Sequence, residues 1–318
     1  MKKILITGSA GFIGFSLAKD LLKKGYKILG YDSLNKYYDV QLKLSRNNIL
    51  KKFKNYTFVK GDIEDQKKLN KHVLKFKPSI IIHLAAQAGV RYSLEVPRKY
   101  ISSNIVGTFN IIELAHKLKT KHLLIASSSS VYGSNKSKSF KETDKTDTQM
   151  SIYAATKKST ESIAHSYSSL WKLPITMLRF FTVYGPWGRP DMAMYIFANN
   201  IQNNKPITVY NNGEMKRDFT YIDDIINGTK AACLSDYKCE IFNLGNHKSE
   251  ELMDMINIIE DSLGKKAIIE YEPIQSGDII ESFADIDKSI ELLNYKPNTD
   301  IIKGIPQFID WYKKYHKV

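Results

Sequence analysis

The sequence predicts an α/β protein, with a doubly wound parallel sheet in the first part of the chain and a smaller α/β portion after it. Two observations lead to this prediction. Short apolar runs rich in β-branched residues alternate with helical patterns over residues 3–181, which is the order of elements that forms a parallel sheet with right-handed crossovers. A glycine-rich turn follows the first run and an acidic residue follows the second, as is typical of doubly wound sheets.

The composition excludes several classes of protein. The 318 residues are 43% hydrophobic and 25% charged, an ordinary balance for a globular chain. The net charge of +14 comes from lysines spread over the whole chain in short pairs, so we interpret it as solvated surface and expect no nucleic-acid partner. Two cysteines without metal-ligand spacing predict no disulfide framework, no metal site and a reducing, cytoplasmic compartment. No apolar run reaches about 18 residues, so we expect no membrane span.

The first strand and the turn after it predict a site for a pyrophosphate. Residues 3–7 (KILIT) are apolar and β-branched, as expected for a strand buried on both faces. The sequence GSAGFIG follows, with Gly8, Gly11 and Gly14 ahead of a helical pattern. Glycines let the backbone approach a phosphate closely, and the start of the helix supplies unpaired N–H groups.

The second strand ends in an acid that suits the ribose of NAD. It is predicted over residues 26–31 and leads directly to Asp32, whose carboxylate can bind ribose hydroxyls. No arginine follows Asp32 directly, which disfavours a 2′-phosphate and hence NADP. The polar and aromatic residues 33–54 are expected to hold a helix beside the cofactor.

The next two strands bring small and polar residues to the same edge of the sheet. A third strand, residues 57–60, is followed by Asp62, which faces an adenine or caps the next helix. A fourth strand, residues 80–86, ends in Ala85 and Ala86, which leave room for a cofactor.

Two polar residues near these strands are interpreted as structural. We interpret His83 as a packed core residue rather than a catalyst. The helix predicted over residues 97–118 carries Asn104 on its sheet-facing side, where its amide can hold backbone groups near the site.

A run of serines follows the fifth strand, which is predicted over residues 122–127. Serine runs often mark linkers, but this one lies at the carboxyl end of a parallel strand, where ligands bind in doubly wound sheets. We therefore interpret residues 127–130 as supplying active-site hydroxyls.

The helix after the serines carries a possible proton shuttle. Tyr153 and Lys157 are four residues apart, so they share one face of a helix that Ser151 can cap. An ammonium close to a phenol favours the phenolate, and the pair can then exchange a proton with a sugar or alcohol hydroxyl. A sixth strand is predicted over residues 175–181.

The remaining chain is expected to form a substrate-binding portion. A loop rich in proline, glycine and aromatic residues covers residues 182–192, and residues 240–244 form a strand that we expect to rejoin the main sheet. We therefore predict an NAD-binding domain over residues 1–181 with residues 221–245, and a substrate domain over residues 182–220 with residues 246–318.

These motifs resemble those of a known family. GSAGFIG, Asp32, HLAAQAG, SSSSVYG and YAATK together resemble the extended short-chain dehydrogenase/reductase family. The segments YDSLNKYYDVQLKLSR, AAQAGVRYSLEVP, RFFTVYGPWGRPDMA and KRDFTYIDDI are similar to its NAD-dependent nucleotide-sugar epimerases, above all to those that act on UDP-glucuronate. The resemblance covers the chain to about residue 244 and implies a Rossmann sheet with a tightly held NAD.

The resemblance implies three sets of site residues. The catalytic residues would be Ser128, Tyr153 and Lys157. The cofactor contacts would come from Gly8, Gly11, Phe12, Ile13, Gly14, Asp32, Asn35, Asp62, Ile63, Leu84, Ala85, Ala86, Asn104, Ser127, Tyr153, Lys157 and Phe180. The UDP-sugar contacts would come from Arg91, Ser128, Ser129, Ser130, Tyr153, Thr182, Arg189, Arg217 and Asp278.

The implied reaction is 4-epimerisation of a UDP-sugar through a 4-keto intermediate. Tyr153 would take the proton of the 4-hydroxyl, with Lys157 lowering its pKa and holding the nicotinamide ribose. Arg189 would bind the carboxylate of a uronate; the alternative is an arginine at the surface or at an oligomer interface. Arg217 with Asp278 would bind the UDP phosphates and the uridine ribose.

Other activities share the same oxidation step. Thr182 stands where galactose-type epimerases carry asparagine, so UDP-glucose or UDP-N-acetylglucosamine 4-epimerase is the alternative. Dehydratases usually carry Thr-Asp-Glu at the serines, and decarboxylases commonly place a glutamate there; this chain has neither. Redox-sensing proteins of this fold typically lose the tyrosine or the lysine. The resemblance also implies a homodimer joined by helices near residues 98–118 and 151–170, and a product used in polysaccharide biosynthesis.

Overall fold

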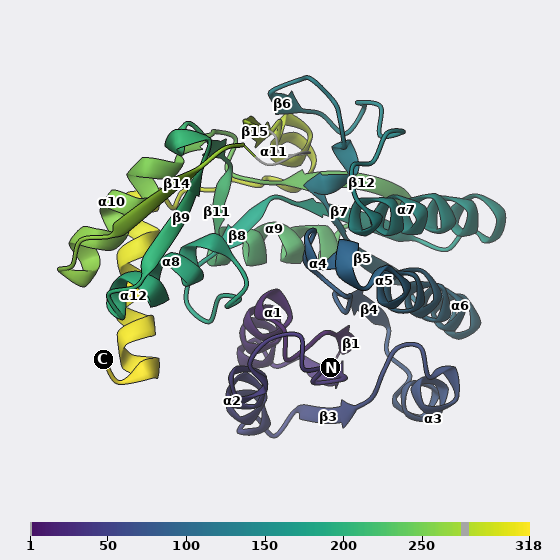
Figure 1. The fold of residues 1–318 in the computed structure, drawn as a ribbon. Helices are drawn as coiled ribbons and strands as arrows, with labels where there is room; N and C mark the ends of the chain where they lie inside the picture. Colours follow the sequence, from purple (N-terminus) through teal and green to yellow (C-terminus); the bar gives the residue numbers. More distant parts are fainter. Residues whose placement is uncertain (1, 275–279) are drawn as a thin grey trace.

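The computed structural model describes residues 2–274 and 280–318, and its centre is a seven-stranded parallel sheet (Figure 1). The strand order is β12-β7-β5-β4-β1-β2-β3. The chain therefore runs outward in one direction from β1 and in the other from β4, which makes the neighbouring ends of these two strands the topological switch point. In chain order the strands are β1 (Lys3–Thr7), β2 (Lys27–Asp32), β3 (Tyr56–Lys60), β4 (Ile80–His83), β5 (His122–Ser128), β7 (Ile175–Phe180) and β12 (Cys239–Leu244). The predicted α/β fold class is confirmed.

Helices cover both faces of this sheet because its strands are apolar on both sides. In β1, Ile4 and Ile6 belong to one buried cluster and Leu5 to the other, as the alternation of side chains along a strand requires. The first cluster packs under α1 (Phe12–Lys23), α2 (Val40–Lys51) and α9 (Ile222–Leu234). The second packs under α3 (Gln66–Phe76), α6 (Gly107–Leu118) and α7 (Ile152–Trp171).

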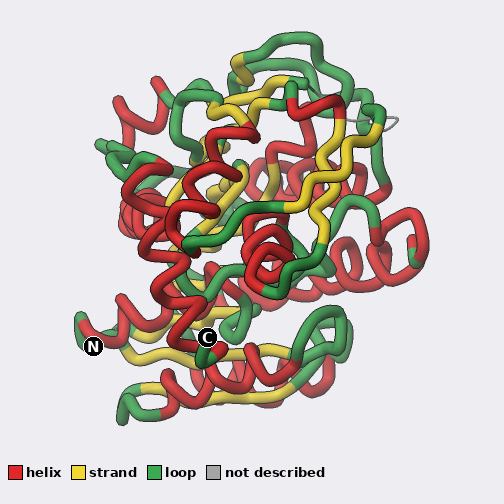
Figure 2. The backbone as a smooth tube through the Cα atoms, turned by 60° about the vertical axis from the view of Figure 1, so that its left-hand side comes forward, coloured by secondary structure: helices red, strands yellow, loops and turns green. Residues whose placement is uncertain are grey.

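In its described residues, the C-terminal portion is built from short sheets and four helices. Its strands form the parallel pairs β8 (Thr182–Tyr184) with β11 (Phe219–Tyr221) and β9 (Pro206–Tyr210) with β14 (Ile268–Glu272). A small sheet joins its strands β13 (Glu250–Glu251), β10 (Lys216–Arg217) and β15 (Glu281–Ala284) to β6 (Ser139–Phe140) from the first part of the chain. Its helices are α8 (Ala193–Gln202), α10 (Leu252–Leu263), α11 (Asp287–Leu293) and α12 (Ile301–His316). Figure 1 and Figure 2 show α12 running along the outside of this portion to the C-terminus.

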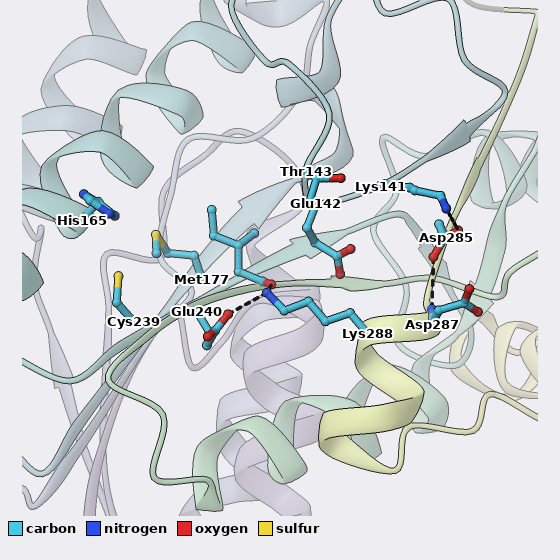
Figure 3. A pocket seen from close by; sticks show the side chains of 11 residues that line it. Lys141, Glu142, Thr143, His165, Met177, Cys239, Glu240, Asp285, Asp287 and Lys288 are labelled. Carbon is cyan, nitrogen blue, oxygen red and sulfur yellow. Dashed lines mark hydrogen bonds and ion pairs between the residues drawn. The ribbon is translucent and has the colours of Figure 1, made fainter.

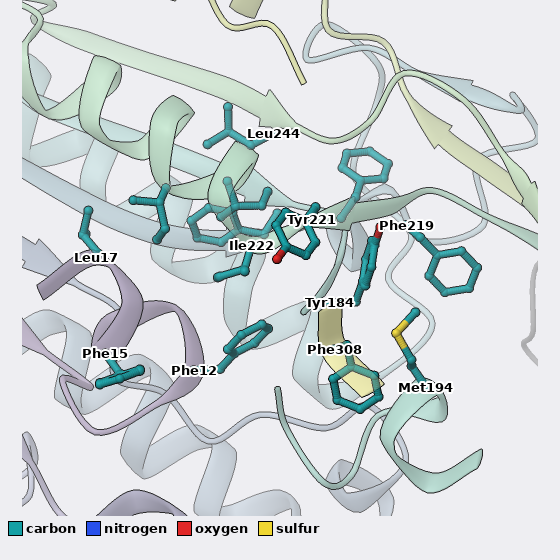
Figure 4. Packing of buried hydrophobic residues seen from close by; sticks show 14 of the residues in the cluster. Phe12, Phe15, Leu17, Tyr184, Met194, Phe219, Tyr221, Ile222, Leu244 and Phe308 are labelled. Carbon is teal, nitrogen blue, oxygen red and sulfur yellow. The ribbon is translucent and has the colours of Figure 1, made fainter. Parts of the chain in front are cut away.

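One hydrophobic cluster joins the two portions. Phe12 and Phe15 of α1 lie in the same cluster as Tyr184, Met194 and Phe308 from the C-terminal portion, and Figure 4 shows Phe12 between α1 and the side chains of Tyr184 and Phe308. Because the two portions share a core, the position of the C-terminal portion is fixed relative to the glycine-rich turn.

Two elements differ from the sequence prediction. The fourth strand ends at His83 rather than Ala86, because its pairing with β1 stops at Thr7, just before the chain turns at Gly8. The helix predicted over residues 97–118 consists of α5 (Pro97–Tyr100), a π-helical segment (Ile101–Val106) and α6. Such π segments often lie at functional sites, and this one contains Asn104.

No helix in the described ranges is both long and apolar enough to cross a bilayer. The same residues contain no group of three or more His, Cys, Asp or Glu side chains that could hold a metal ion.

Candidate active site

The glycine positions of the turn after β1 are too tightly packed for a side chain. A Cβ atom on Gly14 would lie 2.1 Å from the carbonyl oxygen of Gly8, and one on Gly8 would lie 2.7 Å from the amide nitrogen of Ala85. Gly8 also has a φ of +72°, which glycine adopts without strain. The backbone at the start of α1 is therefore left open, and the first N–H groups of the helix point out of it. This cradle fits the pyrophosphate of NAD.

Asp32 lies next to this cradle at the end of β2. Its carboxylate accepts hydrogen bonds from the backbone N–H of Ala10 (3.0 Å) and of Leu34 (2.9 Å). Burial raises the pKa of Asp32, while these two N–H groups and then Lys43 and Arg46 oppose the rise. The carboxylate is thus held beside the glycine-rich turn, as the ribose of a dinucleotide requires.

Arg46 connects this turn to the loop that carries Arg189. It is fully buried. Its Nη1 donates to the carbonyl of Ala10 (3.1 Å) and to the hydroxyl of Tyr38 (2.8 Å). Its Nη2 donates to the carbonyls of Trp187 (2.5 Å) and Gly188 (3.0 Å). The Arg46 side chain therefore fixes the position of the glycine-rich turn relative to the loop after β8.

The three predicted catalytic residues meet at the ends of β5 and α7. Ser151 caps α7 by accepting a hydrogen bond from the N–H of Ala154 (3.1 Å), which places Tyr153 in the first turn and Lys157 one turn later. The hydroxyl of Ser128 lies close enough to Tyr153 to lower the pKa of its phenol. The ammonium of Lys157 is buried and donates to the carbonyl of Ala126 (2.9 Å).

The electrostatics of Tyr153 differ from the expectation. Burial raises its pKa, while the hydroxyl of Ser128 and the charge of Arg189 act in the opposite direction. We expected Lys157 to lower this pKa; its ammonium is instead bonded to Ala126, and burial lowers its own pKa to about 8. In this structure Ser128 and Arg189 are the groups that favour the Tyr153 phenolate.

The serine run divides between two faces of β5. Ser127 is buried and donates to Oε1 of Glu161 (2.6 Å), whereas Ser128 belongs to the site. Ser129 and Ser130 lie in a 3-10 turn, and both the hydroxyl and the backbone N–H of Ser130 interact with Ser128 Oγ (3.2 Å each). A contact of Ser127 with a cofactor stays a prediction.

Asn104 and His83 hold the backbone behind the site. The side chain of Asn104 accepts from the N–H of Gln87 (2.8 Å) and donates to its carbonyl (3.1 Å) and to the hydroxyl of Thr156 (3.0 Å). His83 lies between the hydroxyls of Thr7 (2.7 Å) and Thr108 (2.9 Å), and burial lowers its pKa to about 3. His83 is therefore a neutral core residue, as interpreted from the sequence.

Arg189 is paired within its own loop. Its Nε donates to Oδ1 of Asp191 (3.0 Å), and its Nη2 donates to Oδ2. The hydroxyl of Tyr37 donates to the same Oδ2 (2.9 Å). Neither Tyr37 nor Asp191 was predicted as a site residue.

The other predicted residues lie around these groups. Asn35 accepts from Lys43 (2.6 Å), whose pKa burial lowers to about 8. Arg91 lies over the ring of Tyr210 (5.0 Å), and Arg217 donates to the carbonyls of Lys216 and Ile280. Half-buried or buried positions at the strand ends are taken by Ile63, Leu84, Ala85, Ala86, Phe180 and Thr182, whereas Asp62 is exposed. Asp278 lies outside the described residues.

A separate cavity of about 420 Å³ lies beyond the edge strand β12 (Figure 3). It is lined by residues such as His165, Met177, Glu240 and Lys288. None of its lining residues is among the predicted site residues, and both of its lysines are paired, Lys288 with Glu240 at 2.6 Å and Lys141 with Asp285 at 3.5 Å.

The geometry agrees with the profile of a known family. The profile of the NAD dependent epimerase/dehydratase family matches residues 4–245. The chain belongs to this family.

Several nucleotide-sugar epimerases are similar to this chain in sequence and structure. The UDP-glucuronate 4-epimerase of Thermodesulfobacterium geofontis is 45% identical over 311 residues, covering 98% of this chain and 96% of the relative. The UDP-glucuronic acid 4-epimerase of Bacillus cereus, solved in complex with UDP-glucuronic acid and NAD, is 34% identical with a TM-score of 0.91, covering 98% and 99%. The UDP-glucose 4-epimerase of Thermotoga maritima, solved with UDP-glucose, is 27% identical with a TM-score of 0.88, covering 99% of each chain.

For an epimerase of this family, the sequence analysis missed the residues of α2. Lys43 and Arg46 lie on the buried face of this helix together with Leu42, Asn47 and Leu50. Cationic residues that recur at the core-facing positions of a helix are the signal that could have found them. Asp191 and Tyr37 are 154 positions apart and carry no such local signal.

Proposed function

We propose that this chain is an NAD-dependent UDP-glucuronate 4-epimerase, which interconverts UDP-glucuronate and UDP-galacturonate. The observation that carries the proposal is the combination of Tyr153, Ser128 and Lys157 with an arginine close enough to act on the Tyr153 phenol. Full-length similarity to enzymes named for this activity supports it.

The chain's own groups supply proton transfer and orientation. The Tyr153 phenolate removes the proton of the sugar 4-hydroxyl, while the Ser128 hydroxyl hydrogen-bonds the same oxygen. Lys157 holds the nicotinamide ribose. NAD, when bound in the cradle of the glycine-rich turn and Asp32, supplies reversible hydride acceptance. The resulting 4-keto sugar turns over in the pocket, and Tyr153 returns the proton to the inverted alcohol.

The groups around the sugar favour epimerisation over loss of carbon dioxide or water. A 4-keto uronate is a β-keto acid, which decarboxylates when the bond from C5 to its carboxylate aligns with the carbonyl π system. Arg189 can bind a carboxylate bidentately, and the hydroxyls of Ser128, Ser129, Ser130 and Thr182 are neutral donors. Such a set can hold the carboxylate out of alignment without providing an acid to expel a hydroxyl.

The two portions of the chain have separate roles in this proposal. Residues 1–181 with residues 221–245 bind NAD, and residues 182–220 with residues 246–318 bind the UDP-sugar, with Arg217 at the phosphates. We place the enzyme in the cytoplasm. Its product is a UDP-activated uronate, the donor form that polysaccharide biosynthesis requires.

The test is turnover of UDP-glucuronate by the purified protein without added cofactor. We expect UDP-galacturonate to form and NAD to be released on denaturation. Turnover of UDP-glucose or UDP-N-acetylglucosamine, with none of UDP-glucuronate, would replace the proposal by the neutral-hexose alternative. Arg189→Ala should lower kcat/KM for UDP-glucuronate far more than for any neutral UDP-hexose that is used; equal losses would remove Arg189 from the carboxylate role.

We further propose a homodimer formed by α6, α7 and the π-helical segment. Large apolar side chains are exposed on these elements, among them Phe109 (40%), Leu170 (67%) and Trp171 (50%). A contiguous exposed apolar face on a soluble chain marks an interface, and two helices from each copy would bury it as a four-helix bundle.

Phe109→Glu should convert the dimer to a monomer, because it places a charge in the middle of this face. Size-exclusion chromatography with light scattering measures the change. Ile302→Glu is the matched control, since Ile302 is 71% exposed on α12 and its substitution should leave the dimer intact. A monomeric wild-type protein would contradict the proposal.

A further inference from the structure

The carboxylate of Asp191 binds one edge of the Arg189 guanidinium, and the other edge can bind a second anion. The Nε and Nη2 atoms of Arg189 both donate to the carboxylate of Asp191, so this pair is bidentate and fixes the plane of the guanidinium. An arginine has five N–H donors in a rigid fork, and the Nη1/Nη2 edge can still receive a carboxylate bidentately. The side chains of Arg189 and Asp191 are only 25% and 21% exposed.

A row of aromatic rings links the pair to Tyr153. Tyr37, which bonds Asp191, packs on Tyr92. Tyr92 packs on Tyr100 (centroids 6.4 Å apart), and Tyr100 packs on Tyr153 (6.2 Å). Arg189 lowers the pKa of Tyr153, and Asp191 opposes this effect. Reciprocally, Tyr153 is among the groups that act on the pKa of Arg189. The guanidinium is therefore near the Tyr153 phenol, which would take the proton of the sugar 4-hydroxyl. In a uronate this hydroxyl is on C4, and the adjacent C5 bears the carboxylate.

Asp191 is itself held from a distant segment. The hydroxyl of Tyr37 donates to its Oδ2 (2.9 Å). The ring of Tyr37 packs on Tyr92 (centroids 4.9 Å apart). A Cβ on Gly89 would lie 2.1 Å from the Tyr37 hydroxyl, so the backbone at Gly89 closes the remaining side. Tyr37 is thereby fixed on three sides and fixes Asp191 in turn.

This arrangement makes it unfavourable for Asp191 to leave Arg189 when a substrate carboxylate binds. Only Pro190 separates Arg189 from Asp191, and its ring restricts the backbone. A departing Asp191 would also become a half-buried carboxylate without its cation, which is unfavourable. If Asp191 stays in place and orients Arg189, the backbone of the loop does not move and no half-buried carboxylate loses its cation.

We propose that Asp191, anchored by Tyr37, is a positioning residue that aims Arg189 at the substrate carboxylate and so protects the 4-keto uronate from decarboxylation. The inference rests on the proposed function. It adds that Arg189 needs Asp191 to hold its guanidinium in the orientation that binds the carboxylate. In the protected state the bond from C5 to the carboxylate stays out of the π plane. With Arg189 misaligned, that bond breaks, carbon dioxide leaves and its electron pair enters the C4 carbonyl as an enolate. C5 then takes a proton from solvent, giving a UDP-4-keto-pentose, and the two electrons removed from C4 stay on the nicotinamide.

The experiment compares Asp191→Asn, Asp191→Glu and Tyr37→Phe in the holoenzyme with UDP-glucuronate as substrate. Asp191→Asn keeps the size of the side chain but removes its charge. We expect kcat/KM to fall by about 100-fold, as for a misplaced binding group, and the ratio of UDP-4-keto-pentose to UDP-galacturonate to rise, with accumulation of the reduced nicotinamide absorbance. Tyr37→Phe should produce the same change to a smaller extent. Asp191→Glu should partly restore epimerisation.

The matched control is Asp254→Asn on α10, where the carboxylate is exposed; it should behave as wild type in both readouts. An Asp191→Asn enzyme with wild-type product ratio, or with a lower KM for UDP-glucuronate, would show Asp191 to be a structural or competing group and would overturn the inference. A wild-type enzyme that does not turn over UDP-glucuronate would instead refute the proposed function.

Discussion

Tyr153→Phe should lower kcat by about 10²–10⁴-fold, the range contributed by a positioned general base. The substitution removes one oxygen from a residue whose pKa is raised by burial and lowered by Ser128 and Arg189. It leaves the cap of α7 at Ser151 and the bond from Lys157 to Ala126 in place. Because the reactive form is the phenolate, the kcat of the wild type should rise with pH, and the variant should lose this dependence.

The measurement is single-turnover formation of the epimer over a range of pH. Tyr271→Phe is the matched control, since that ring is 53% exposed on β14 and its hydroxyl has no role in the mechanism. Retention of kcat within tenfold in Tyr153→Phe would mean that another group takes the proton.

Arg179→Met should destabilise the protein by about 3–5 kcal/mol, the usual cost of leaving a buried charge without its partner. Arg179 and Glu161 are each 2% exposed. They form two hydrogen bonds of 2.9 Å, and Glu161 also accepts from Ser127. The pair joins β7 to α7 beside Ser127, the residue before Ser128, so its loss should also loosen the site.

Urea unfolding measures the free energy of unfolding of this variant. The double variant Arg179→Met/Glu161→Gln should recover much of the loss, because no charge is then left buried. Lys248→Met is the control: it removes surface ion pairs to Glu250 and Asp300 and should cost less than about 1 kcal/mol. An equal loss of unfolding free energy in Arg179→Met and Lys248→Met would show that the buried pair contributes no more to stability than a surface ion pair.

The local parts of the site could be predicted from the sequence. The glycine-rich turn, Asp32 and the Tyr153–Lys157 spacing depend on neighbours in the chain. The structure places the turn after β1, Asp32 at the end of β2, and Lys157 against β5. The division of the serines could also have been predicted, because successive residues of a strand face opposite sides. Ser127 and Ser128 therefore cannot both face a cofactor.

The parts that depend on packing between distant segments could not be predicted. No pattern near Asp191 shows that a tyrosine from the segment after β2 will reach it. The bond from Lys157 to the Ala126 carbonyl, which keeps the ammonium from governing Tyr153, depends on how α7 packs on β5. The π-helical segment around Asn104 likewise follows from tertiary contacts, since its sequence also suits an ordinary helix.

Arg46 has a consequence for redesigning the substrate range of this enzyme. Its guanidinium spans the cofactor cradle at Ala10 and the loop carbonyls of Trp187 and Gly188. A loop exchanged for that of a neutral-hexose epimerase would have to present two carbonyls at the same places, or a buried cation would lose half of its acceptors. The loop after β8 and helix α2 should therefore be exchanged together, because Arg46 couples them.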